Sequence, residues 1–362
     1  MAAERSRYAS EEGCPEVRLE RVIQTFDDLI GRFGEHAVAA GDEVYIQPYV
    51  DLSLHLIQMR VAGWTDMDYD QLAAVSGASA LYGYEPGAFM PKYAHLDVSP
   101  GERIAEATGF GYEWVGFEGM DGAWSLLVES VDAGRPVKGW DWENIMFAGY
   151  QDAHVAEDRR VYALADGPDT YAKWLTWGEF GEWAKRVEGW KAAQLGRHTE
   201  RIPTKPVEEV ALRVIRDLVA WSTEPPEHVR ESYPKVTFGL AGIAAYAADC
   251  ADIDTHGDWT ACHDINPQWT VRNSTGVYLK RVAGSGAFSE GVNAHLLAAA
   301  EQYRAAYECW QAFYALLGHK ATEGAKAVGE RRLAGAAVVR AWQAHEKAGV
   351  AAVEKALNLL DR

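Results

Sequence analysis

The chain has 362 residues and a net charge of -18, from 35 basic and 53 acidic side chains. Hydrophobic residues make up 48% and charged residues 24%, which supports a packed core and excludes global disorder. A nucleic-acid backbone or an anionic membrane surface would be repelled by this acidic balance. We therefore expect a small-molecule or peptide ligand as partner, and neither nucleic acid nor membrane.

The cysteines are few and widely spaced, at Cys14, Cys250, Cys262 and Cys309. This spacing argues against a disulfide framework and favours a reducing compartment. The charged N-terminal residues are followed by no apolar segment, and no apolar run reaches the roughly 18 residues of a membrane span. The sequence thus predicts a cytoplasmic protein.

The first half of the chain alternates helical and strand patterns. A helix is expected over 51–62, since Leu52, Leu56 and Met59 recur at helical spacing, and a second short helix follows from Tyr69 to Ser76. Helices are also expected near 101–108, around Trp124 and from Trp177. Tyr112 and Trp114 are assigned to an aromatic loop. Short segments bounded by Gly, Pro or Asp predict a meander of three strands, over 136–142, 144–150 and 161–165.

The second half is predicted to be almost entirely helical. Its last two helices, near 289–317 and 322–360, should pack as an antiparallel hairpin. The other helices are expected near 206–222, 237–250 and 268–283. We therefore expect an α+β domain over residues 1–200, with helices packed on a small antiparallel sheet, followed by an all-α domain over 201–362. The helical domain is also a candidate interface for a homodimer.

The order of pieces between residues 40 and 190 resembles papain-like domains. A helix and a short helix precede a Ser-Gly turn, and Leu-Val-Glu-Ser-Val-Asp-Ala-Gly-Arg-Pro-Val follows at 127–137. One strand then ends in Phe-Ala-Gly-Tyr at 147–150, and the next in Ala-Asp-Gly-Pro at 165–168. The arrangement is similar to bacterial double-glycine peptidases and to the N-terminal domain of butirosin biosynthesis acyltransferases. The resemblance implies a papain-like fold and a cleft.

Two of the three catalytic positions that the resemblance implies are substituted. The family's nucleophilic Cys opens the first helix, and that position is Val50 or Asp51 here. The family's His corresponds to Glu143, with Trp142 or Asn144 if the alignment slips by one residue. The orienting acid corresponds to Asp166. Because a carboxylate cannot replace a thiolate in acyl transfer, the usual Cys–His chemistry is not expected.

The resemblance instead brings Asp51, Glu143 and Asp166 into one cleft. Such acids could act as acid and base, bind a divalent ion or recognise an amine. In the structural alternative, Asp51 is a helix N-cap, Glu143 a solvated residue at a strand edge and Asp166 a turn residue. Ser53, one turn along the first helix, is a substitute nucleophile without a His to activate it.

Aromatic and small polar residues complete the candidate ligand site. Trp140 and Trp142 alternate with Asp141, so both indoles face the same side of their strand. Together with Ser53 and with Ser76 of the Ser-Gly turn, they are our candidates for ligand contacts.

The segment 250–263 contains Cys250, His256, Cys262 and His263, which are zinc-ligand types. Its Asp-x-Asp-x-x-Gly start is typical of a calcium loop, but position twelve is His263 where a carboxylate is needed. A polar loop between two helices is the better interpretation, and we expect neither a metal nor another cofactor.

Three functions remain open from the sequence. In the first, a divergent papain-like protein binds a small amide, peptide or amine-bearing ligand in an acidic, aromatic-lined cleft. In the second, the three acids make the chain a repurposed hydrolase or acyltransferase. In the third, the cleft is vestigial and the helical domain is a dimerisation scaffold.

Overall fold

The computed structural model describes residues 17–24, 50–64, 67–86, 90–92, 100–140, 144–165, 172–256, 259–260, 266–317, 326–327 and 329–361. The chain divides into two compact units. The first consists of Met1–Tyr69 and Phe110–Ile202, and the second of Asp70–Gly109 and Pro203–Arg362. The fold is mixed α+β with an antiparallel sheet, as the sequence predicted, whereas the papain-like relationship stays a prediction.

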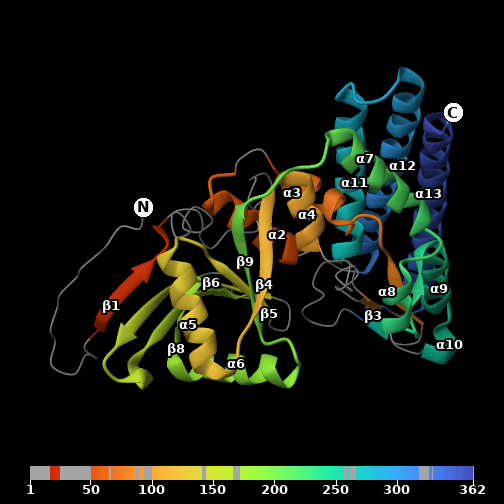
Figure 1. Ribbon diagram of the computed structural model, residues 1–362. Helices are drawn as coiled ribbons and strands as arrows, with labels where there is room; N and C mark the ends of the chain where they lie inside the picture. Colours follow the sequence, from red (N-terminus) through yellow and green to blue (C-terminus); the bar gives the residue numbers. More distant parts are fainter. Residues whose placement is uncertain are drawn as a thin grey trace. The chain divides into compact units, whose positions relative to one another are not determined.

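The first unit is built on a seven-stranded antiparallel sheet (Figure 1). Six strands follow the spatial order β4-β9-β5-β6-β7-β8, and β1 pairs with the end of β6 that extends beyond β5. The strands are β1 (Val17–Val22), β4 (Phe110–Gly116), β5 (Val137–Trp140), β6 (Asn144–Ala153), β7 (Arg160–Ala165), β8 (Ala172–Thr176) and β9 (Gln194–Arg201).

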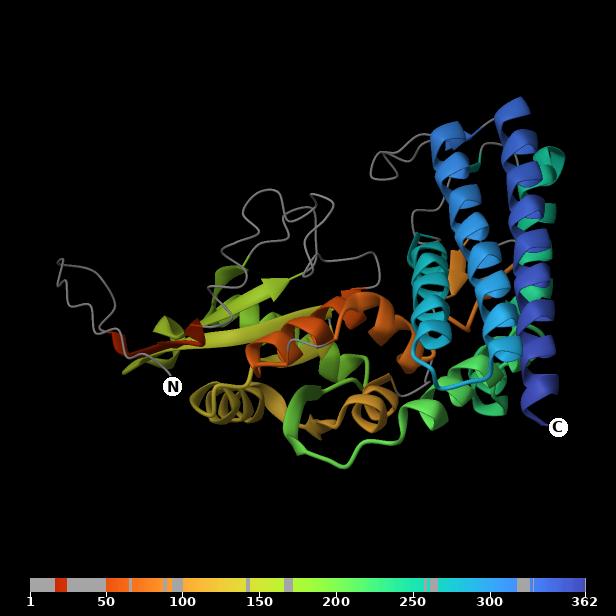
Figure 2. The ribbon, with the colours of Figure 1, turned by 90° about the horizontal axis from the view of Figure 1, so that it is seen from above.

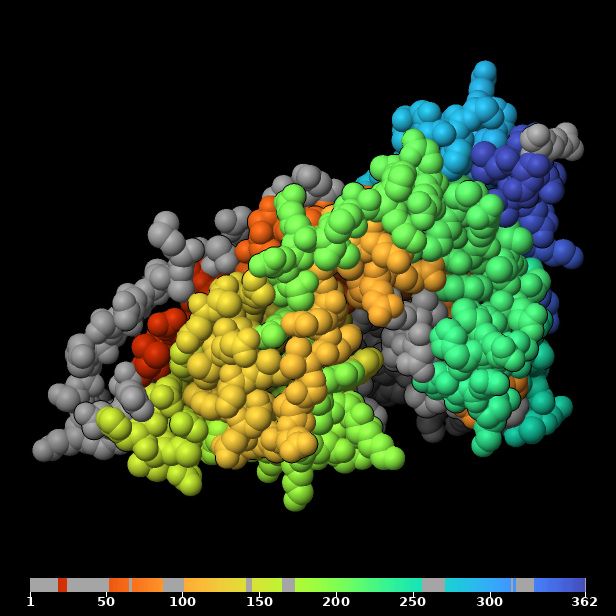
Figure 3. All heavy atoms as spheres, in the orientation of Figure 1, coloured from red at the N-terminus to blue at the C-terminus, as the bar shows by residue number. Residues whose placement is uncertain are grey.

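Helices α5 (Gly119–Asp132) and α6 (Trp177–Gly189) cover one face of this sheet with a predominantly apolar core. Phe147 of β6 packs edge-on against Phe180 and Trp183 of α6, with ring centroids 5.6 and 4.7 Å apart. The outer residues of α5, yellow in Figure 3, form much of the surface of the first unit on this side. Helix α2 (Val50–Val61) contacts β6 and β9.

The packing of Trp183 decides which way the residues of β5 point. Its Cζ2 atom lies 2.7 Å from the place that a Cβ on Gly139 would occupy, so Gly139 faces α6. Successive strand residues point to opposite faces. Lys138 and Trp140 therefore face the other side of the sheet. The Nε1 of Trp183 also donates a 2.6 Å hydrogen bond to the carbonyl of Trp140.

The second unit is mainly helical, and Figure 2 shows α11, α12 and α13 side by side. Contacts of Gly291 with Leu359 and of Tyr303 with Gly349 run in opposite directions along α12 and α13, so these two helices are antiparallel. The helices are α3 (Tyr69–Ser76), α4 (Pro100–Thr108), α7 (Val207–Ala220), α8 (Glu227–Ser232), α9 (Gly239–Ala251), α10 (Ile253–His256), α11 (Asn266–Gly284), α12 (Glu290–Leu317) and α13 (Glu330–Leu360).

Short strands accompany these helices. A three-stranded antiparallel sheet has the order β10-β2-β3, and β11 pairs with β12. Their bounds are β2 (Gly83–Glu85), β3 (Met90–Lys92), β10 (Thr237–Phe238), β11 (Trp259–Thr260) and β12 (Lys326–Ala327).

A buried ion pair stands inside the second unit. Arg272 of α11 and Glu346 of α13 bond through Nε and Oε1, with 3% and 7% of their side chains exposed. Arg272 Nη1 donates to the carbonyl of Ser79 at 2.7 Å, and Trp342 Nε1 donates to Glu346 Oε1 at 2.9 Å. Each charge is therefore hydrogen-bonded as well as paired, which burial of an ion requires.

Most of the predicted elements in the described residues are confirmed. The predicted helices correspond to α2 to α7, α9 and α11 to α13, and the predicted meander corresponds to β5, β6 and β7. The aromatic loop at Tyr112 and Trp114 is wrong, because both residues belong to β4. The strand β9 was missed, as were β1 and β8.

The domain division expected at residue 200 stays a prediction. It assumed two continuous segments, whereas the compact units are discontinuous, since residues 70–109 pack with the helical unit. Among the described helices, none is both long and apolar enough to cross a membrane. Homodimer formation and cytoplasmic location likewise stay predictions.

Thr176 begins α6 with a capping box. Its Oγ1 accepts a hydrogen bond from the Glu179 amide, and Glu179 Oε2 accepts one from the Thr176 amide at 2.7 Å. We expect Thr176→Ala to lower the free energy of unfolding by about 1 kcal/mol, because the Glu179 amide loses its acceptor. Urea denaturation measures this. Ser125→Ala, on the exposed face of α5, is the control and should change stability by less than about 0.5 kcal/mol.

Candidate functional site

The predicted acidic cluster lies largely outside the described residues. Glu143, Asp166 and Trp142 all fall there, and of Asp51 the structure describes only its place in the first turn of α2. The helix does begin at the position where the resemblance places a nucleophile. Ser53, in the same helix, is buried, with 2% of its surface exposed. The meeting of the three acids stays a prediction.

Trp140, the remaining candidate of this unit, belongs to an aromatic wall. We use this name for Tyr112 and Trp114 of β4 together with Trp140 of β5. The Trp114 and Trp140 rings are almost parallel, at 12°, with centroids 6.2 Å apart. Tyr112 packs edge-on against Trp114 at 5.8 Å. All three side chains are half-buried, so the wall retains accessible aromatic surface.

Lys138 lies on the buried side of the aromatic wall, and the sequence analysis did not identify it as a site residue. Its surface is 1% exposed, and its Nζ lies 5.5 Å from the Tyr112 ring centroid and 5.2 Å from that of Trp114. The negative faces of aromatic rings attract a cation at this range. The Lys138 side chain therefore lies on the inner side of the wall, within cation–π distance of two of its rings.

Helix α2 lies on the same face of the sheet as the wall. The His55 and Tyr112 rings are 4.5 Å apart, and His55 is 1% exposed. Gln58, which is fully buried, donates hydrogen bonds from Nε2 to the carbonyls of Pro136 at 2.9 Å and Gly196 at 3.1 Å. One side chain thus joins α2 to the start of β5 and to β9, which holds the wall in place.

A second histidine continues the aromatic surface along β9. His198 pairs with Tyr112 in the sheet register, and its ring stacks on Phe110 at 5.2 Å. Burial lowers the pKa of His198 to about 4, and the positive charge of Arg135 adds to the effect. At neutral pH His198 is therefore uncharged, and within the described residues its buried Nδ1 has no hydrogen-bond partner.

Ser76 belongs to the second unit, and its described contacts are local. The fully buried hydroxyl donates to the carbonyl of Ala73 at 3.1 Å and accepts from the amide of Ala78 at 3.2 Å. These bonds close the C-terminal end of α3. They account for a serine at this position without a ligand.

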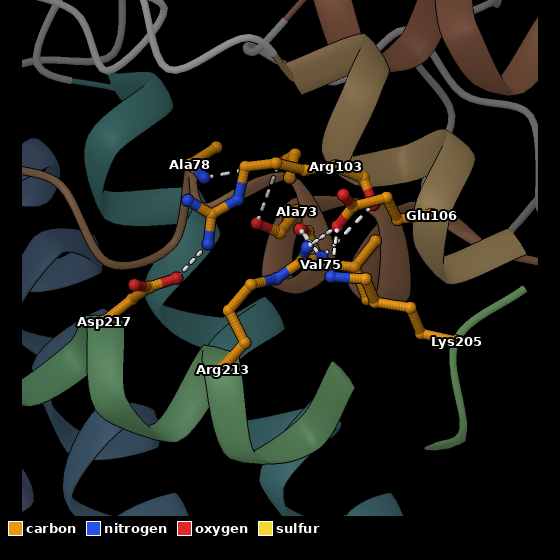
Figure 4. A network of polar contacts seen from close by, with 9 residues as sticks. Ala73, Val75, Ala78, Arg103, Glu106, Lys205, Arg213 and Asp217 are labelled. Carbon is orange, nitrogen blue, oxygen red and sulfur yellow. Dashed lines mark hydrogen bonds and ion pairs between the residues drawn. The ribbon is translucent and has the colours of Figure 1, made fainter. Parts of the chain in front are cut away.

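A network of charged residues holds that end of α3 against α4 and α7 (Figure 4). Arg103 pairs with Asp217, and Arg213 pairs with Glu106, which also contacts Lys205 at 3.3 Å. Arg213 Nη2 donates to the carbonyl of Arg103 at 3.2 Å. Each of these charged side chains thus has a partner of opposite charge within the second unit.

The structure offers no described metal centre. Among the residues it describes, no three His, Cys, Asp or Glu side chains lie close enough together to hold an ion. Cys262 and His263 lie outside these residues. Cys250 is buried, and burial raises the pKa of its thiol to about 12, so the thiol stays protonated and unreactive.

No family model matches the sequence, and no curated protein matches it.

The first site prediction concerns Gln58. Gln58→Met keeps the shape of the side chain but removes two donors, so two buried carbonyls lose a partner. We expect the free energy of unfolding to fall by about 2 kcal/mol. Gln151→Met is the matched control, since Gln151 bonds Glu20 on the surface, and it should cost less than about 0.5 kcal/mol. Equal losses in both variants in urea would contradict the assigned role of Gln58.

The second site prediction concerns pH. The pKa of His198 is about 4 in the folded chain and 6.5 when unperturbed, so between these values only the unfolded state takes up the proton. Stability should therefore fall as the pH drops from 6.5 toward 4, and this contribution is absent above 6.5. His198→Phe keeps the ring and removes the titration. Thermal unfolding between pH 4 and 7 should show a smaller pH dependence in this variant than in the wild type.

Proposed function

We propose that the chain is a papain-like protein that has diverged from Cys–His chemistry and binds a small amide or peptide against the aromatic wall. The observation that carries the proposal is the pair of near-parallel, half-buried indoles of Trp114 and Trp140. Flat aromatic surfaces stack well on planar groups, and an amide is planar. The family resemblance adds support through its implied cleft beside α2.

The substituted catalytic positions support ligand binding without the Cys–His reaction of the papain-like family. The expected nucleophile position holds Val50 or Asp51, and neither can form the thiolate on which the family's acyl transfer depends. The neutral His198 cannot supply the missing base from its described place, since its neighbour is the Phe110 ring rather than an activated hydroxyl or thiol.

Binding can be tested with a panel of small amides, dipeptides, esters and amines by saturation-transfer NMR. We expect amides and dipeptides to bind the wild type. Trp114→Leu should raise their dissociation constants about fivefold or more, because stacking surface is lost. Trp190→Leu is the matched control, since Trp190 is 46% exposed at the end of α6, and it should leave binding unchanged.

Two outcomes would contradict the proposal. One is that no amide or dipeptide binds the wild type. The other is that Trp114→Leu and Trp190→Leu bind the panel equally well. Hydrolysis of the panel is followed in the same samples, because turnover would favour the alternative in which Asp51, Glu143 and Asp166 catalyse a reaction.

A further inference from the structure

A hollow in the second unit lies where α8 meets β10 and the start of α9. It has a volume of about 500 Å³, within the range typical of small-molecule sites. Phe238 and Pro225, both buried, belong to its lining, and Tyr233 and Val236 are half-buried beside them. The inner surface is thus mostly apolar.

The charged side chains that line the hollow form one ion pair, and Thr223 and Thr237 add hydroxyl groups to the lining. Arg230 Nη1 lies 2.6 Å from Glu224 Oε1, with 45% and 64% of these side chains exposed. This contact uses one of the five N–H groups of the guanidinium and one of the carboxylate oxygens. Each partner therefore keeps capacity for a ligand group of opposite charge.

The backbone around the hollow is constrained at several positions. The Leu240 amide donates to the Ser222 carbonyl at 2.7 Å and closes the segment between them. Gly239 allows this closure, because its φ is +59° and a Cβ there would lie 2.1 Å from that carbonyl oxygen. Pro226 and Pro234 restrict the chain on either side of α8. A preformed site spares a ligand the cost of ordering its walls.

From these features we infer that the hollow binds a zwitterionic α-amino acid with an aromatic or large apolar side chain. The side chain occupies the apolar interior, the carboxylate binds Arg230, and the ammonium binds Glu224. A zwitterion leaves the ion pair electrically balanced, whereas a simple acid or a simple amine satisfies only one partner. This site is independent of the aromatic wall and of the function proposed for it.

The test is a saturation-transfer titration of the full-length chain with L-phenylalanine at low ionic strength. L-Phenylalanine should bind more tightly than 3-phenylpropionate, which lacks the ammonium, and than phenethylamine, which lacks the carboxylate. Arg230→Gln should raise the dissociation constant of L-phenylalanine about fivefold, which is the effect expected from the loss of one exposed ion pair. Arg216→Gln, an exposed arginine of α7, should leave its binding unchanged.

A second variant tests the place of binding without altering charge. Ala241 is exposed and lines the hollow, so Ala241→Phe fills it and should abolish binding while the thermal midpoint stays close to that of the wild type. The inference is overturned if L-phenylalanine does not bind, if Arg230→Gln and Arg216→Gln behave alike, or if Ala241→Phe binds normally. Equal affinity for 3-phenylpropionate would overturn the zwitterion assignment.

Discussion

The contact between Trp183 and Gly139 sets the geometry on which the first unit depends. The Trp183 indole lies where a Cβ on Gly139 would be, so Gly139 must face α6. The hydrogen bond from Trp183 Nε1 to the Trp140 carbonyl holds the next residue of β5 in place. Lys138 and Trp140 are consequently directed to the face of the sheet opposite α6. The placement of Lys138 and of the aromatic wall follows from a packing constraint on the other face of the sheet.

Basic side chains are buried in both units of this acidic protein. Lys138 lies within cation–π distance of two aromatic rings. Arg272 bonds the carboxylate of Glu346 and a backbone carbonyl. The net charge of the chain thus says little about which side chains are buried at a particular place.

The long helices of the second unit could be predicted because their apolar residues recur at helical spacing over many residues. The meander could be predicted because its strands are short, apolar and bounded by turn residues. Strand β9 could not, since Gln-Leu-Gly-Arg-His-Thr-Glu-Arg is mostly polar and its burial comes from neighbours distant in sequence. Strand β4 did carry a signal, because Phe110, Tyr112 and Trp114 recur at the strand period of two.

The difference between local patterns and contacts between distant residues also limited the prediction of the site. Trp140 was found from the alternation within its own strand. Lys138 was not, because an isolated lysine in a sequence gives no sign of burial, and its partners Tyr112 and Trp114 reach it only through the pairing of β4 and β5 with β9. A cluster assembled from three strands is invisible to local pattern, whereas the hydroxyl of Ser76, with contacts two and three residues away, serves a purely local purpose.

The position of β9 also has a consequence for the order in which the chain can fold during synthesis. β9 lies between β4 and β5 in the sheet, although it follows both in the sequence. As the polypeptide leaves the ribosome, β4 and β5 have no strand to join them until residues 194–201 have emerged. At that point α3 and α4 of the second unit have also been made, but α7, which packs with them, has not. Early-made segments of both units must therefore wait for later ones, and a nascent chain stalled before residue 194 would expose unpaired strand edges to aggregation or to chaperones.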